Sequence, residues 1–457
     1  MKKMIAFMLA LTVMLGTIAG CSQTQESSPA KDKDNEVSQS ENNNKPEKKE
    51  PIKMVLNLGG FLSDPSVVAA LDEIQTLEEF SHMEFVILED DADYDTKMPI
   101  AVASGEQMDI IGVFNSINRT RYAEAGTIIP MDDLADKMGI DFEEAFGSHA
   151  ANAKIGDDIF IVPQRRSSWV LYYNKAVFDK AGMDYPDTDV PMTWDEYAAL
   201  AAKLTMGESS NKTYGALHML WPIFWYGEAI MALGGGDKFY DPEGLSNIEE
   251  PIFAKALERT YKMMHVDKSI PTHADMVVSK TSPQAFMNGQ YGMMVSGSWV
   301  LNWSMDKETY PRDWKLGIAP MPVDAGTVPK TWGDTRGYGI PVTSTHPEEA
   351  MKVAIELARL GAKHAISDPA SYKLEESPNL YVKAEEILVE DQITIDLLKK
   401  TFANPDTVFA VEKIMGKNNV DYDQVIKEES EKYFVKEQDL ETTIKNIKER
   451  MDKILVK

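Results

Sequence analysis

The chain has only one cysteine among its 457 residues, so it cannot form an internal disulfide. It is also short of positive charge, because 47 lysines and arginines stand against 73 acidic residues and give a net charge of -26. Nucleic acids and anionic lipid surfaces both require clustered cations, so neither is a predicted partner. The simplest consequence of the acidity is solubility.

Catalytic and metal-binding motifs are missing as well. We find no Gly-x-Ser-x-Gly, no His-Glu-x-x-His, no phosphate-binding Walker loop and no paired-cysteine metal site. The seven histidines are scattered, and the acidic run Glu89–Asp95 lacks the glycine and spacing of a calcium-binding EF-hand loop. We predict no metal and no cofactor, although a glycosidase-type pair of carboxylates remains open because acidic residues are abundant.

The N-terminus has the organisation of an export signal. Two lysines precede an apolar stretch from Met4 to Ile18, which ends in Ala-Gly-Cys. This ending resembles the lipobox of bacterial lipoproteins, which implies that Cys21 carries the lipid (palmitate) anchor; the alternative is an incidental cysteine after an ordinary signal peptide. We therefore predict a signal peptide at 1–20, then the lipidated cysteine and a disordered polar tether at 21–50. The protein would sit exported and lipid-anchored on the outer face of the cell membrane.

The folded body is predicted to begin at Ile52 with alternating strands and helices. This alternation indicates an α/β fold in which helices cover a parallel sheet. The expected early elements are a strand from Ile52, a helix at Pro65–Phe80, a strand at Met83–Leu88, a helix at Met98–Ser104 and a strand at Met108–Val113. Ligands bind beyond the carboxyl ends of such strands, which makes Gly59–Phe61 and Phe114–Arg119 candidate site segments.

The later elements are predicted from capping and periodicity. Thr193 followed by Glu196 is a capping box that opens a long helix. The other expected elements are strands at Val170–Asn174, Tyr291–Ser296 and Gly337–Pro341 and helices at Pro251–His265, Pro347–Leu360 and Leu440–Val456.

Four sequence blocks together resemble one known family. They are Asp109–Leu134, Ile159–Thr205, Phe286–Trp299 and Gly317–Pro341, and they occur in the right order over most of residues 52–360. These blocks resemble the family 1 extracellular solute-binding proteins, the group that includes maltose-binding protein. The C-terminal portion matches only loosely.

This resemblance implies a two-lobe periplasmic-binding-protein-like fold of type II, with the ligand in a cleft. It divides the chain into an N-terminal lobe, 51–164 plus 332–385, and a C-terminal lobe, 165–331 plus 386–457, with crossings near Gln164–Ser168 and Thr335–Tyr338. The implied function is the substrate-binding subunit of an ABC transporter, which as a monomer delivers a carbohydrate, an oligosaccharide above all, to its membrane permease. An extracellular glycan-processing enzyme and a ligand-presenting sensor subunit are the alternatives.

A sugar site needs aromatic rings for flat apolar faces and charged or amide groups for hydroxyls. Trp299 matches a sugar-stacking aromatic of the family, while Ser167 replaces an acidic contact of the maltose-binding members and puts maltodextrin in doubt. Arg165 and Arg166 point opposite ways in an extended segment, so at most one faces the cleft. Arginines at both crossings would also suit an acidic sugar such as a uronate. The predicted ligand-binding residues are Phe61, Phe114, Asn115, Arg119, Arg165, Arg166, Trp221, Trp225, Trp299, Trp332, Asp334 and Arg336.

Overall fold

The computed structural model describes residues 50–88, 94–404 and 406–457 of the chain. The chain separates into two units, Met1–Lys49 and Glu50–Lys457, and every element described below belongs to the second unit. The predicted signal peptide, Cys21 and all but the last residue of the predicted tether lie outside the described residues, as does most of the acidic run Glu89–Asp95. None of the helices in the described part of the chain combines the length and apolar character needed to cross a bilayer.

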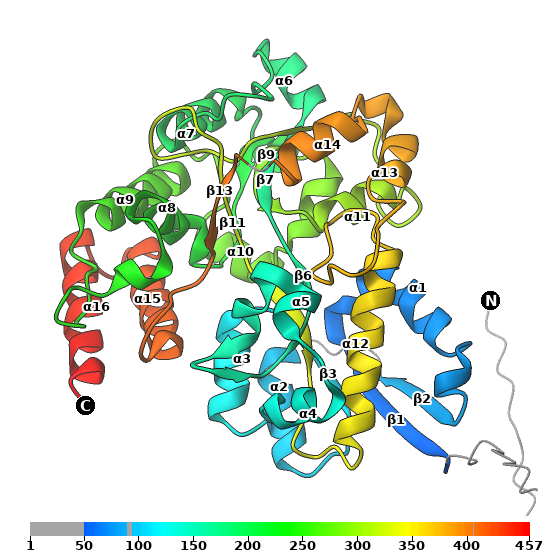
Figure 1. The fold of residues 1–457 in the computed structure, drawn as a ribbon. Helices are drawn as coiled ribbons and strands as arrows, with labels where there is room; N and C mark the ends of the chain where they lie inside the picture. The colour runs from blue at the N-terminus through cyan, green and yellow to red at the C-terminus, as the bar shows by residue number, and fades with distance from the viewer. Residues whose placement is uncertain (1–49, 89–93, 405) are drawn as a thin grey trace, which may run out of the picture. The chain divides into compact units, whose positions relative to one another are not determined.

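The first sheet has five strands in the order β2-β1-β3-β12-β6 (Figure 1). β1 runs parallel to β2 and β3, as the alternation of strands and helices predicted, whereas β12 runs antiparallel to β3 and β6. The strands are β1 (Ile52–Asn57), β2 (Met83–Leu88), β3 (Ile110–Val113), β6 (Val162–Arg166) and β12 (Thr335–Gly339). A strand from far along the chain therefore completes the sheet that the N-terminal segment begins.

In the described part of the chain, six helices and a small hairpin accompany this sheet. The helices are α1 (Pro65–Ile74), α2 (Tyr94–Ala103), α3 (Ser116–Glu124), α4 (Asp132–Met138), α5 (Phe142–Phe146) and α12 (Pro347–Lys363), and the hairpin strands are β4 (Lys154–Ile155) and β5 (Asp158–Ile159). Helix α1 packs against α12 through one apolar face, although the two helices are far apart in sequence.

Helix α1 is shorter than the predicted span Pro65–Phe80. It ends at Ile74, and a short 3-10 turn, Glu78–Phe80, follows it. The hydroxyl of Thr76 donates a hydrogen bond to the Glu73 carbonyl at 2.7 Å and offers that carbonyl a local partner in place of a further helical turn. Helix α2 begins at Tyr94, four residues before the predicted start.

The second sheet has the order β10-β7-β9-β8. β9 pairs antiparallel with β7 and parallel with β8, and β10 pairs antiparallel with β7. The strands are β7 (Trp169–Asn174), β8 (Tyr214–Leu217), β9 (Tyr291–Gly297) and β10 (Leu316–Ala319). All residues of β7 and β9 are buried, because elements cover both faces of this sheet.

The rest of the second lobe is mostly helical. Its helices are α6 (Lys175–Ala181), α7 (Trp194–Leu204), α8 (Ile223–Leu233), α9 (Pro251–His265), α10 (His273–Ser279), α11 (Val300–Met305), α13 (Val382–Ile387), α14 (Ile395–Phe402), α15 (Asn419–Phe434) and α16 (Leu440–Leu455). The predicted capping box is confirmed at α7, where the Glu196 amide donates to the Thr193 hydroxyl and the Glu196 carboxylate accepts from the Thr193 amide. Outside the main sheet, β11 (Lys330–Gly333) pairs in parallel with β13 (Val408–Val411).

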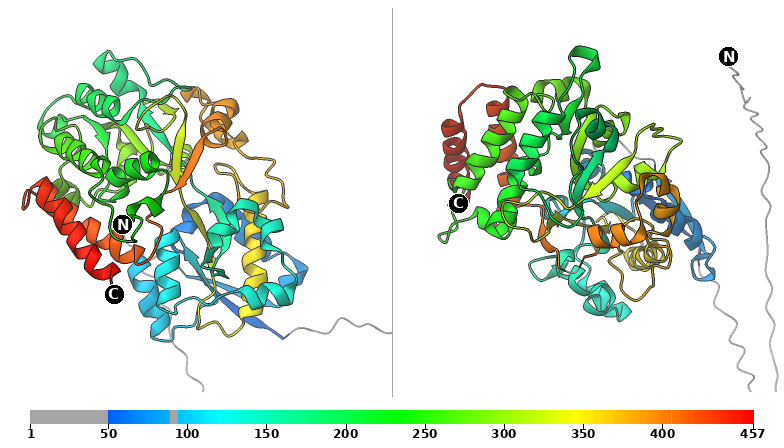
Figure 2. Two further views of the ribbon diagram at one scale, coloured as in Figure 1. Left: turned by 60° about the vertical axis from the view of Figure 1, so that its left-hand side comes forward. Right: turned by 90° about the horizontal axis from the view of Figure 1, so that it is seen from above.

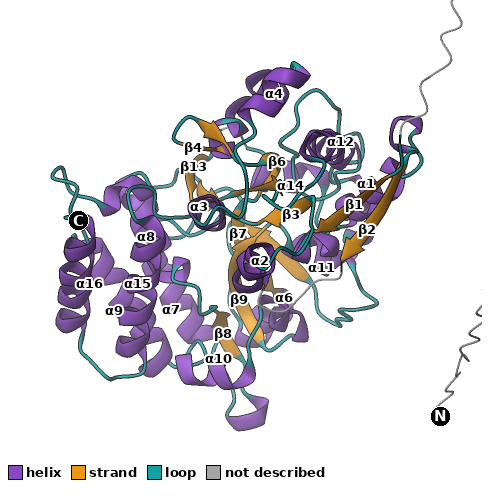
Figure 3. Ribbon diagram, turned by 90° about the horizontal axis from the view of Figure 1, so that it is seen from below, coloured by secondary structure: helices purple, strands orange, loops and turns teal. Residues whose placement is uncertain are grey.

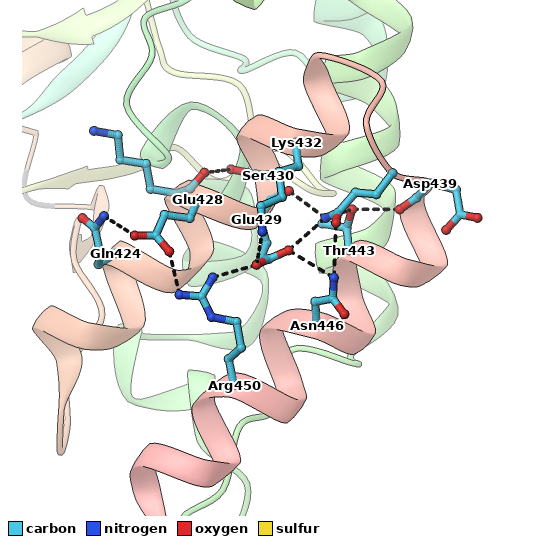
Figure 4. A network of polar contacts seen from close by, with 11 residues as sticks. Gln424, Glu428, Glu429, Ser430, Lys432, Asp439, Thr443, Asn446 and Arg450 are labelled. Atoms are coloured by element: carbon cyan, nitrogen blue, oxygen red, sulfur yellow. Dashed lines mark hydrogen bonds and ion pairs between the residues drawn. The ribbon is translucent and has the colours of Figure 1, made fainter.

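The last two helices are joined by a buried polar network. Figures 1 and 3 show α9, α15 and α16 side by side, and these three helices contact one another. Glu429 of α15 accepts from Lys432 at 2.7 Å and from Arg450 of α16 at 2.6 Å, with amide contacts from Gln438 and Asn446 (Figure 4). Burial alone would raise the pKa of Glu429, but these donors outweigh it and lower the pKa to about 2.

Two separate apolar cores correspond to the two sheets. One core gathers residues from Met54 to Val162 together with Tyr338 to Leu360, and the other extends from Trp169 to Trp332 and from Tyr381 to Leu455. Trp332 and Tyr381, which the predicted division gives to the N-terminal lobe, pack in the second core. Figure 2 shows the two bodies from two further directions.

The chain passes between the two sheets at closely packed crossings. The first crossing lies at 167–168, between β6 and β7, and the second is Asp334, one residue before the predicted segment. The Ser167 amide donates to the Asp334 carbonyl at 3.1 Å, so the crossings bond directly to each other. A Cβ on Gly333 would lie 1.9 Å from the Ser167 carbonyl oxygen, so only glycine allows this approach. A third connection, 364–381, follows α12.

Candidate ligand-binding site

Both lobes line one cavity of about 430 Å³. It lies beyond the carboxyl ends of β1 and β3, which deliver Gly60, Phe114 and Asn115, in agreement with the strand-end prediction. The described residues that line it are Gly60, Ser63, Asp95, Phe114, Asn115, Arg165, Ser167, Trp169, Trp221, Ile223, Trp299, Trp303, Asp334, Arg336, Glu412 and Lys413. This volume falls in the range of small-molecule sites.

Four of the eight tryptophans form the wall contributed by the second lobe. Trp169 contacts two of the others. Its ring meets Trp299 edge-on with centroids 5.6 Å apart, and Trp221 with centroids 6.3 Å apart. Trp169 is almost fully buried, whereas 40% of Trp221 is exposed. Trp169 therefore orients the rings of Trp221 and Trp299, which present more of their surface to the cavity.

The position of Trp299 depends on the glycine two residues before it. Trp299 follows β9 and precedes α11, and a Cβ on Gly297 would lie 2.0 Å from the Trp299 ring. The ring can fold back over the strand end only because Gly297 has no side chain. This explains the Gly-x-Trp spacing in the sequence.

An ion-pair cluster forms the opposite wall. Arg165 of β6 contacts Asp64 and Asp368 at 2.9 Å each, and Arg336 of β12 contacts the same Asp64. Burial alone would raise the pKa of Asp64, but the guanidinium groups of Arg165 and Arg336 outweigh it and lower the pKa. Asp368 belongs to the third connection between the lobes, so the cluster joins residues next to all three crossings.

Arg336 is held from three sides. Its Nε donates to Gln164 at 2.7 Å, and its guanidinium lies 4.4 Å above the Phe61 ring. Burial, with the nearby Arg165 as the second cause, lowers the pKa of Arg336 to about 10. Phe61 is fully buried and does not line the cavity, so it supports Arg336 from behind.

Two charged residues enter the cavity from the end of β13. Pairing of β13 with β11 continues into a hydrogen bond from the Glu412 amide to the Gly333 carbonyl at 2.9 Å. The Glu412 carboxylate accepts the Trp169 indole N–H at 2.6 Å, and the Lys413 Nζ lies 3.6 Å from the same carboxylate. Burial, opposed by Lys413, raises the pKa of Glu412.

Asp334 organises the crossing at the cavity floor. Its carboxylate accepts the backbone N–H of Ser116 at 2.8 Å and the Ser116 hydroxyl at 2.7 Å, at the start of α3. Its other carboxylate oxygen accepts the Thr335 amide. Ser167, which departs from the family's acidic position, lines the cavity and bonds with the Asp334 backbone.

The structure brings seven of the twelve predicted ligand-binding residues to the cavity. They are Phe114, Asn115, Arg165, Trp221, Trp299, Asp334 and Arg336. Of the adjacent arginines, Arg165 lines the cavity, while Arg166 lies over the Phe409 ring at 3.8 Å. This agrees with the expectation that the two point in opposite directions.

Besides Arg166, the other four predicted residues lie away from the lining for different reasons. Phe61 supports Arg336, and Trp332 is buried in the second core, stacked on Trp194 with centroids 5.7 Å apart. Trp225 is also buried, inside the helical layer beside Thr260 and Met264. Arg119 is 4% exposed, and within the described part of the chain its Nε and Nη1 have no hydrogen-bond partner. Burial lowers the pKa of Arg119, and Asp334 opposes that shift.

Sequence reasoning missed several lining residues, chiefly Trp169, Trp303, Glu412, Lys413 and Asp95. Trp169 directly follows the first crossing, which was a usable signal. Glu412 and Lys413 carry no comparable signal, because they come from the C-terminal portion that matches the family only loosely. Among the described residues, no group of three His, Cys, Asp or Glu side chains could hold a metal ion.

Comparison with known proteins identifies the family. The model of the bacterial extracellular solute-binding proteins matches residues 85–359, more than half of the chain. The chain belongs to this family. The resemblance seen in the sequence blocks is thereby confirmed.

This solute-binding protein is 26% identical over 257 residues to a binding protein of Brucella abortus (strain 2308), a match covering 56% of this chain and 58% of the relative. The chain thus spans somewhat more than half the length of this relative.

Solved structures show the fold over nearly the whole body. One is an ABC substrate-binding protein of Listeria monocytogenes in complex with cycloalternan, with a TM-score of 0.68 and 21% identity over 89% of this chain and 100% of that chain. Another is the maltose-bound MalE3 of T. maritima, with a TM-score of 0.67 and 19% identity over 88% of this chain and 100% of that chain. The fold is the two-lobe α/β fold of type II periplasmic binding proteins, as predicted.

Proposed function

We propose that this solute-binding protein captures a carbohydrate in the cavity between its lobes and delivers it to the permease of an ABC importer. The observation that carries the proposal is the composition of the cavity. A wall of four tryptophans faces a wall of carboxylates, guanidinium groups and an amide. Rings stack on the apolar faces of a sugar, while the polar groups bond its hydroxyls.

The comparisons support this ligand class. The Listeria monocytogenes structure holds cycloalternan and the T. maritima structure holds maltose, and both share the fold. An oligosaccharide suits the cavity volume of about 430 Å³.

Two lobes that close on the ligand account for capture. We propose two lobes close to the predicted division, which is 51–164 plus 332–385 for the first lobe and 165–331 plus 386–457 for the second. The chain passes from one lobe to the other at Asp334 and again in the third connection after α12. A ligand that touches Trp299 on one lobe and Arg336 on the other stabilises the closed form, because only that form contacts it from both sides. The permease would receive the closed, monomeric protein.

The proposal includes export and lipid attachment. The sequence Ile-Ala-Gly-Cys makes Cys21 the lipidated first residue of the mature protein, and the tether holds the body near its permease. Metabolic labelling with palmitate should mark the wild-type chain. Cys21→Ser should abolish the label and release the protein from the membrane fraction, and a labelled serine variant would contradict the assignment.

We propose that the protein releases its ligand without any chemical change. The family is one of solute-binding proteins, which favours binding over glycan hydrolysis. Incubation with oligosaccharides followed by chromatography should return them intact, whereas products formed with turnover would establish an enzyme.

A thermal-shift screen tests the carbohydrate assignment directly. Mono-, di- and oligosaccharides should be screened against the purified body, residues 50–457, and each hit measured by calorimetry. We expect at least one saccharide to raise the melting temperature and bind with a one-to-one stoichiometry. A screen in which no saccharide binds would overturn the proposal.

A further inference from the structure

The charged side chains around the cavity are paired with side chains of opposite charge. Arg165 and Arg336 share Asp64, and Arg165 also holds Asp368. Lys413 faces Glu412. Every basic group that lines the described cavity therefore already has a carboxylate beside it.

The surrounding shell adds one net negative charge to a lining whose own charges balance. The lining has three carboxylates and three basic groups. Behind it, Asp64 and Asp368 add two carboxylates, and Arg119, which faces Asp334, adds one guanidinium. Arg121 beside Asp95 and Asp423 beside Lys413 offset each other. Counted over the described residues, the site has one more carboxylate than cationic groups.

Resting on the proposed function, we propose that this cavity selects neutral saccharides and rejects anionic ones, with Glu412 as the specificity-determining residue. Recognition of a sugar carboxylate needs a cation whose fork is free to pair with it. Here an incoming carboxylate would have to displace Asp64, Asp368 or Glu412, or lie beside them as a like charge.

The groups that do remain available suit hydroxyls. Within the described residues, Oδ1 of Asp95 is buried and accepts no hydrogen bond, and Asp95 lines the cavity. A hydroxyl of the ligand can donate to the Asp95 carboxylate on the cavity wall, whereas a ligand carboxylate offers only acceptors. Lys413, held 3.6 Å from Glu412, can donate to a neutral hydroxyl without losing its counter-charge.

Glu412 is the residue whose negative charge offsets the positive charge of Lys413 in the cavity. It projects from the end of β13, holds Trp169 by a 2.6 Å hydrogen bond and neutralises the lysine next to it. Glutamine at this position keeps an acceptor for the indole and removes the charge. Lys413 would then stand in the cavity without its closest counter-charge.

The test compares matched ligands on the wild-type body by calorimetry. Neutral di- and trisaccharides of glucose, mannose and galactose are paired with the same sugars carrying a uronate. We expect every uronate to bind at least about thirtyfold more weakly than its neutral counterpart. A uronate that binds as tightly as its neutral partner, or tighter, would overturn the selectivity while leaving the carbohydrate assignment standing. Failure of both classes to bind would instead overturn the proposed function, and the inference with it.

The variant Glu412→Gln tests the assigned residue. The ratio of uronate to neutral affinity should rise about tenfold at low ionic strength, and the gain should shrink in high salt because it is electrostatic. Glu386→Gln, an exposed position on α13 outside the lining, makes the same change in net charge and should leave the ratio as in wild type. An unchanged ratio in Glu412→Gln, in protein that still binds a neutral sugar, would remove Glu412 as the determinant.

Discussion

Trp299 and Trp332 are both tryptophans close to a crossing or strand end, yet they have different environments. Trp299 is partly exposed at the cavity, whereas Trp332 is 1% exposed and stacked on Trp194. A ring that contacts ligand contributes to affinity, and a ring inside the core contributes to stability.

The variant Trp299→Ala should therefore weaken ligand binding by about 2 kcal/mol or more, roughly thirtyfold in Kd, because the stacking surface is lost. Titration by calorimetry or tryptophan fluorescence measures the change. The matched control is Trp332→Phe, which should lower the melting temperature and leave Kd within about twofold. Unchanged affinity in Trp299→Ala would remove Trp299 from the site.

These two residues also show how far the site could be predicted. The Gly-x-Trp spacing pointed to Trp299, which does line the cavity, since Gly297 is required for its ring position. Trp332 and Trp169 each border a crossing, and the sequence does not say which neighbouring strand covers which ring. Pairing of β11 with β13 and the stack on Trp194 bury Trp332. These are contacts between distant segments that local patterns do not specify.

At the scale of elements, α15 and α16 depend on the buried carboxylate of Glu429. Its side chain is 2% exposed and is held by Lys432 and Arg450. Because its pKa of about 2 is below the ordinary 4.5, the folded state favours the ionised form.

Glu429→Gln should lower the free energy of unfolding at pH 7 by about 2 kcal/mol, because two cations lose their shared partner. The wild-type advantage is complete above pH 4.5 and diminishes as the pH falls toward 2, where Glu429 itself becomes protonated. Denaturant unfolding between pH 7 and pH 3 measures this trend. The exposed Glu386→Gln is the control, and an advantage that grew on acidification would contradict the account.

Elements were predictable where a local signal is strong. The capping box at Thr193 and the apolar face of α9 gave helices at the expected residues. The predicted helix from Pro65 extended too far because Thr76 bonds back to Glu73, a local competition that periodicity does not reveal. The antiparallel place of β12 between β3 and β6 follows from chain crossings, not from the pattern of the strand itself.

At the scale of the whole molecule, two cores share one cavity, so ligand should stabilise both together. A ligand at one hundred times its Kd should add about 2.7 kcal/mol to the free energy of unfolding. Scanning calorimetry with and without a saccharide from the screen measures this gain. In Trp299→Ala the gain at the same concentration should be smaller, and an equal gain would mean that the ligand binds elsewhere.

The end of β13 has a further consequence. The family model matches residues 85–359, yet Glu412 and Lys413 reach the cavity from beyond that match. A short segment late in the chain thus lines a cavity whose other residues come from much earlier in the sequence. We expect that exchanging 408–413 between homologous receptors changes which ligand is recognised, which makes this segment a compact starting point for engineered biosensors.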